Sequence, residues 1–215
     1  MGRMISLERK VLALSDPRLF TRFWILGLFG VIGPILTLAL MGLAISQAPW
    51  FSWTGDALSD LGVHGQSAVL FNSGLIAGGV LSVIFALGVM RYYLSQRVGR
   101  CGAFFLLLAG IFLVSIGVFP ETAPNNIHYA VSVAFFATFP MSLLIQSAAL
   151  LSIGVRRKLG AFTLTVAIAA AVPWAIWLPL KPYNGVAIPE LVSALAATAW
   201  SIVMGTLLMR ERHAA

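Results

Sequence analysis

The sequence predicts an all-α polytopic membrane protein, a bundle of six transmembrane helices with both termini in the cytoplasm. Apolar residues make up 60% of the 215 residues and charged residues only 10%, and the mean hydropathy is +0.95. Soluble domains are roughly 45–50% apolar. Six stretches without a charged residue are each 19 to 29 residues long, and about 20 residues cross a bilayer. These stretches run over 23–46, 65–90, 101–120, 127–155, 159–180 and 191–209.

The basic residues predict the orientation of these helices. Thirteen of the 14 Lys and Arg residues fall before the first helix, after the last, or in the second and fourth connections, all on one side of an alternating topology. Lys181 alone lies on the other side. By the positive-inside rule both termini are cytoplasmic, and we predict a multi-pass protein of the cell membrane. Because the basic residues are scattered next to the membrane without interleaved aromatics, no nucleic acid is expected as a partner.

The chain begins with a charged segment that we assign to the cytoplasm, residues 1–17. Within it, apolar residues over 4–15 follow a helical pattern, which predicts an interfacial amphipathic helix. Asp16 followed by Pro17 is typical of a helix start. The transmembrane domain is then expected over 18–210 and a cytoplasmic tail over 211–215.

Two of the predicted helices carry small residues at every fourth position. Gly74, Gly78 and Ser82 follow this pattern in helix 65–90, and Ala197 is at the centre of the same pattern in helix 191–209. Small residues let transmembrane helices approach closely. We therefore predict that both helices pack through these faces, while Val83 is expected to face lipid.

Most of the scarce polar residues gather in the three connections on the outer side. Four of the seven acids and two of the three histidines lie there. The first connection holds Asp56, Asp60 and His64; the second Glu121, Asn125, Asn126 and His128; the third Lys181, Tyr183, Asn184 and Glu190. All three connections can meet above one bundle, and ionisable groups beside a bundle mark functional sites.

A polar stripe extends this group into the membrane. From His128, steps of four and three residues place six side chains on one helix face: His128, Ser132, Phe135, Phe139, Ser142 and Gln146. Asn72 stands just below the first connection, where a buried amide needs a partner. The predicted ligand-binding residues are Ser59, Asp60, Asn72, Glu121, His128 and Ser132. No residue is assigned as a metal ligand.

Several residues of the first outer connection also have simpler, structural interpretations. Asp60 in "SDLG" can cap a turn, which is the usual role of Asp before Gly. His64 next to Gly65 is consistent with a solvated loop residue. Trp50, Phe51 and Trp53 fit the aromatic belt at the membrane surface.

Several of these segments resemble a known family. "LSDLG" at 58–62, "FNSGLIAGG" at 71–79, and "GVFPE" followed by "IHYAVSVAFF" between 117 and 136 are similar to the uncharacterised multispanning family called domain of unknown function 998. The resemblance covers roughly residues 20–210 and implies a six-helix prokaryotic membrane protein without an established activity. It marks Ser59, Asp60, Asn72, Glu121 and His128, which are also in the polar set above.

Three functions remain open from the sequence. The first is binding or transport of a small polar ligand or a lipid headgroup at the outer site. The second is a membrane assembly or signalling partner that docks another membrane protein without chemistry of its own. The third is a lipid hydrolase or transferase, with His128 as general base or with a metal held by His64, His128 and a carboxylate.

Against the enzyme, no G-x-S-x-G, H-E-x-x-H or phosphate-binding glycine loop is present. The chain also has a distant likeness to alkaline ceramidases and adiponectin receptors, which combine Ser, Asp and three His around zinc in seven helices. It lacks two of these features. This chain has six predicted spans and only two histidines on one side. Membrane lipid is an expected partner under every interpretation, and no cofactor is identified.

Overall fold

The computed structural model describes residues 17–154 and 156–210, and the side chains among them from residue 23 onward apart from residue 153. The segment 1–16 and the tail 211–215, for which we predict an interfacial helix and a cytoplasmic end, lie outside the described residues. Within the described chain, six helices are long and apolar enough to cross a membrane. They are α2 (Pro17–Ser46), α3 (Gly65–Tyr92), α4 (Arg97–Val118), α5 (Ile127–Ile153), α6 (Arg157–Leu180) and α7 (Ala187–Arg210). The predicted all-α membrane bundle is confirmed at this level.

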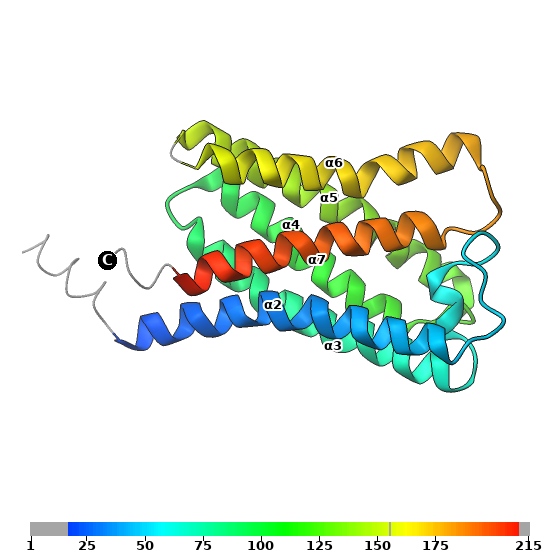
Figure 1. Ribbon diagram of the computed structural model, residues 1–215. Helices are drawn as coiled ribbons and strands as arrows, with labels where there is room; N and C mark the ends of the chain where they lie inside the picture. Colours follow the sequence, from blue (N-terminus) through cyan, green and yellow to red (C-terminus); the bar gives the residue numbers. More distant parts are fainter. Residues whose placement is uncertain (1–16, 155, 211–215) are drawn as a thin grey trace, which may run out of the picture.

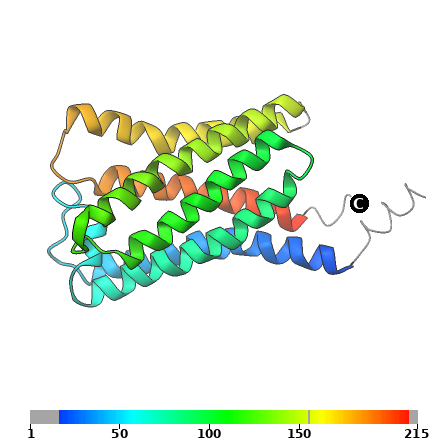
Figure 2. The same ribbon diagram turned by 180° about the vertical axis from the view of Figure 1, so that it is seen from behind.

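The helices form a closed ring. Each packs against its neighbours in the chain, and α7 returns to pack against α2. Figure 1 shows that the start of α2 and the end of α7 lie at the same end of the bundle. Figure 2, seen from behind, shows α4 and α5 completing the ring.

Two short 3-10 helices lie at the opposite end of the bundle, which we call the η1 end. They are η1 (Leu58–Gly62), between α2 and α3, and η2 (Pro124–Asn126), directly before α5. The connection from α6 to α7 is at this end as well (Figure 1). Three connections far apart in the sequence therefore meet where the polar residues are concentrated.

The small face of α3 packs as predicted, and its partner is α2. A Cβ atom at Gly78 would collide with Thr37 Oγ1, and one at Gly74 would lie 2.9 Å from Leu40 Cβ. The Thr37 hydroxyl donates to Gly33 O at 3.0 Å and reaches Gly74 O at 3.3 Å. The α2–α3 contact therefore depends on glycine at both positions of α3.

The small face of α7 contacts two neighbouring helices, α6 and α2. Ser193 Oγ donates to Ala170 O of α6 at 2.9 Å, and Gly205 lies against Gly27 of α2, with the added Cβ only 2.6 Å from Gly27 O. Ala197, between them, lines a cavity and also packs against the hydrophobic core cluster. The small face of α7 thus packs against the interior of the bundle, and Ala197 also borders the space that the ring leaves along its axis.

The prediction that Val83 faces lipid is wrong. Its Cγ2 atom would meet a Cβ atom added to Gly110 at 3.0 Å, so it packs against α4 and not against lipid. Val80 is an exposed position on the same helix, with 46% of its surface accessible. A helix that is apolar all round gives no pattern from which its rotation can be deduced.

Backbone hydrogen bonds join the first connection to the third at the η1 end. Gly185 N donates to Thr54 O at 2.9 Å, and Val186 N and Ala187 N both donate to Asp56 O at 3.1 Å. A Cβ atom at Gly185 would collide with the Asp56 backbone. The segment before η1 is thereby held against the start of α7.

Candidate functional site

Local turn chemistry brings His128 to the interior. Asn125 and Asn126 adopt left-handed conformations, with φ of 61° and 53°, which Asn tolerates better than most residues. Together with Pro124 they form the tight turn η2, after which α5 begins at Ile127. The first turn of α5 then points His128 inward, where it is only 7% exposed.

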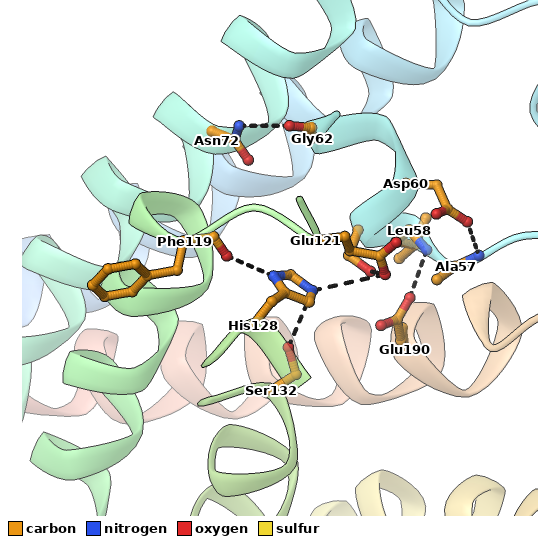
Figure 3. Close-up of polar contacts among 11 residues, drawn as sticks. Ala57, Leu58, Asp60, Gly62, Asn72, Phe119, Glu121, His128, Ser132 and Glu190 are labelled. Carbon is orange, nitrogen blue, oxygen red and sulfur yellow. Dashed lines mark hydrogen bonds and ion pairs between the residues drawn. The ribbon is translucent and has the colours of Figure 1, made fainter. Parts of the chain in front are cut away.

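Hydrogen bonding sets the tautomer of His128 (Figure 3). Its Nδ1 lies 2.7 Å from Phe119 O; since a carbonyl oxygen can only accept, Nδ1 carries the proton. In the neutral ring, Nε2 then holds the lone pair. Ser132 Oγ is 3.4 Å from Nε2 and Glu121 Oε1 is 3.9 Å from it. Nε2 can therefore accept a proton beside a carboxylate.

η1 carries the next two predicted residues. Ser59 Oγ donates to Glu121 Oε1 at 2.8 Å, which ties the first connection to the second. Asp60 Oδ2 accepts from Ala57 N at 2.7 Å, so the capping role of Asp60 is present. The same carboxylate also lies beside Glu121.

Asn72 is apart from the others. Its Nδ2 donates to Gly62 O at 2.9 Å, which braces the end of η1 against α3 (Figure 3). It contacts none of the other five predicted site residues. The structure thus brings together Ser59, Asp60, Glu121, His128 and Ser132 and gives Asn72 a supporting position behind η1.

Glu190 is a site residue that the sequence prediction did not include. It lies in the first turn of α7 and is 8% exposed. Its Oε2 accepts from Leu58 N at 2.6 Å, across 132 residues of sequence. Pro189, a residue typical of helix starts, was the available signal that α7 begins before Glu190.

Two hollows lie on opposite sides of η1. A surface pocket of about 750 Å³ opens at the η1 end; its lining comprises Trp50, Asp56, Asp60, Val63, His64, Glu121 and Thr122. An inner cavity of about 100 Å³ lies inside the ring and is lined by η1 and by every described helix of the bundle except α6. Leu58 and Ser59 line the inner cavity, while Asp60 lines the surface pocket.

The polar stripe of α5 runs down the inner wall as predicted. Ser132, Phe135 and Phe139 line the inner cavity. Further along the helix, Ser142 Oγ donates to Gly102 O at 2.8 Å and accepts from Gln146 Nε2 at 2.9 Å. The stripe therefore supplies the cavity wall near the η1 end and a contact with α4 at the other.

His64 does not join His128. Its ring lies edge-on to Trp50 in the surface pocket, with centroids 6.1 Å apart, whereas His128 faces the interior. Among residues 17–154 and 156–210, no three His, Cys, Asp or Glu side chains are grouped so that they could share a metal ion. The described geometry therefore gives no support to the mixed zinc site considered from sequence.

Comparison with known families agrees with the resemblance seen in the sequence. The model of the family described as "Protein of unknown function (DUF998)" matches residues 31–207. The chain belongs to this family. No curated protein and no solved structure matches the chain. The matched region covers α3 to α6 and most of α7, begins within α2, includes the whole of the site, and brings no activity with it.

The environment of Glu121 makes protein stability depend on pH. Burial raises the pKa of Glu121 above its ordinary value of 4.5, and contact with Asp60 raises it further, against opposing effects from Ser59 and His128. Between the unfolded and folded pKa values the folded protein binds more protons than the unfolded chain. The contribution of Glu121 to stability is therefore largest at a pH below its ordinary pKa, and it is lost as the pH rises through the raised pKa.

We expect this contribution to disappear in Glu121→Gln. The thermal midpoint of the purified protein, measured in detergent from pH 4 to pH 8, should fall less steeply with pH in this variant than in the wild type. Identical slopes for both proteins would show that Glu121 is not the responsible group.

Proposed function

We propose that this integral membrane protein binds a small ligand or a lipid headgroup that carries an amine or ammonium group, in the surface pocket lined by Asp60 and Glu121, with His128 against Glu121 from the inner side. The observation that carries the proposal is the charge of the pocket. Its lining holds three carboxylic acids and no Lys or Arg. The proposed orientation, with the η1 end outside the cell, is supported by the distribution of basic residues.

The geometry supports a cation in two ways. Carboxylates that lie close together are stabilised by an opposite charge within about 4–6 Å. Among the described residues, His128 is the basic group that forms an ion pair with Glu121, at 3.9 Å. Trp50 adds an aromatic face, which attracts ammonium groups. Binding is favoured over hydrolysis because the one hydroxyl that contacts His128, that of Ser132, is 3.4 Å from Nε2 and lines the inner cavity.

The test uses probes from both possible sources. Free choline and ethanolamine are titrated calorimetrically against the purified protein in nanodiscs of neutral, amine-free lipid. In a second arm, native mass spectrometry compares retention of phosphatidylethanolamine with that of phosphatidylglycerol. Binding of free choline or ethanolamine identifies a soluble ligand, whereas retention of phosphatidylethanolamine alone identifies a lipid headgroup.

Asp60→Asn is the informative variant. Asn can still accept from Ala57 N, and it caps about as well as Asp, so the turn should survive while the charge is lost. We expect the Kd for the bound amine to rise at least fivefold with an unchanged thermal midpoint. Gln47→Ala, an exposed change at the same end of the bundle, is the matched control. Failure of every amine to bind, or equal affinity in Asp60→Asn, would refute the proposal.

A further inference from the structure

The inner cavity has a composition different from that of the surface pocket. Six of its lining residues carry hydroxyl groups and most of the others are apolar, among them five phenylalanines: Phe71, Phe85, Phe135, Phe136 and Phe139. Of the lining residues, Glu190 alone has an ionisable side chain. One carboxyl group in an apolar chamber is an arrangement that needs a physical explanation.

Glu190 has no basic partner within the part of the chain that the structure describes. Oε2 accepts from Leu58 N at 2.6 Å, and none of the described donors bonds to Oε1. The nearest ionisable groups that act on it are Glu121 and Asp60, which carry the same charge. A buried carboxylate is costly unless a cation or further donors compensate it, so its second oxygen is available to a ligand.

The volume of the cavity limits the ligand. A cavity of about 150 Å³ holds benzene, so about 100 Å³ accepts a molecule of roughly five non-hydrogen atoms. The phenylalanine-rich wall selects a hydrocarbon body, and the carboxyl group at the η1 end selects a donor-bearing head, best a cation.

We infer that the inner cavity is a second binding site, specific for a compact alkylammonium ion whose charged nitrogen pairs with Glu190 and whose hydrocarbon part lies among the phenylalanines. This site is separate from the surface pocket, since η1 lies between them and Glu190 lines only the cavity. It does not depend on the function proposed above.

The experiment uses three probes of one size that differ in head group: n-butylamine, which is a cation at neutral pH, 1-butanol and butyrate. Binding to the full-length protein in nonionic detergent is measured by saturation-transfer NMR, with protein-free micelles as the blank. We expect n-butylamine to bind with a millimolar Kd, at least tenfold more tightly than 1-butanol, and butyrate not to bind. Equal binding of the amine and the alcohol would overturn the inference without any variant.

Two variants assign the probe to a site. In Glu190→Gln, the side-chain oxygen can still accept from Leu58 N, so the hydrogen bond is kept and the charge is removed. The Kd of n-butylamine should rise at least tenfold there and that of 1-butanol less than twofold. In Gln47→Ala, an exposed change at the η1 end, both values should match the wild type. Loss of n-butylamine binding in Asp60→Asn but not in Glu190→Gln would place the amine in the surface pocket and refute the inner site.

Discussion

Replacing Gly78 with Leu is expected to lower the free energy of unfolding by about 3 kcal/mol or more, the upper part of the range for overpacked sites. Even the first side-chain atom would collide with Thr37 Oγ1. The Thr37 hydroxyl would then have to leave Gly33 O and Gly74 O, the two carbonyl groups it contacts. The measurement is the thermal midpoint in detergent, which we expect to fall by several degrees.

Val80→Leu is the matched control for this change. It adds a methylene group to an exposed position of the same helix, and surface changes of this kind are usually within about 0.5 kcal/mol. A double-mutant cycle sharpens the test. Gly78→Ala should destabilise less in a Thr37→Ala background, because the colliding oxygen is gone. Equal losses in both backgrounds would contradict the role of Thr37.

Replacing Gly185 with Ala is expected to have the second largest effect, through the η1 end of the bundle. The added methyl group would meet the backbone of Asp56, which cannot rotate away as a side chain can. The hydrogen bonds from residues 185–187 to Thr54 and Asp56 would be broken or lengthened. We expect a loss of about 1–3 kcal/mol and, because Asp56 lines the surface pocket, weaker binding of the amine.

Gly55→Ala tests whether any glycine in this connection is equally sensitive. Its Cβ atom would approach only the side chain of Ser52, at 3.1 Å from Oγ, and that side chain can adjust. The thermal midpoint should therefore stay near the wild-type value. If Gly55→Ala were as damaging as Gly185→Ala, the close approach to Asp56 would not be the cause.

The sequence was sufficient to predict the helices but not their rotation. Apolar runs bounded by charges locate each span to within a few residues, because the thickness of the bilayer sets their length. Lipid is as apolar as the interior of a bundle, so inward and outward faces have similar compositions. For this reason Val83, which packs against α4, could not be distinguished from the exposed Val80.

The sequence was sufficient to predict those residues of the candidate site that the topology alone brings to one end of the bundle. Ser59, Asp60, Glu121 and His128 come from connections that had to meet at one end, and Ser132 follows His128 by one helical turn. Glu190 was overlooked because the charge-free stretch begins at residue 191, which made this acid look like the last residue of a loop. Its burial arises from the three-dimensional contact with Leu58, which no local pattern reveals.

The position of η1 has a mechanical consequence for the two hollows. A single turn of 3-10 helix is the partition between them, with Leu58 and Ser59 on one side and Asp60 on the other. Asn72 and Glu190 anchor this partition from α3 and α7. A ligand that displaced η1 toward the inner cavity would shrink that cavity and enlarge the surface pocket, and displacement in the other direction would do the reverse. Binding in the two hollows is therefore expected to be mutually opposed.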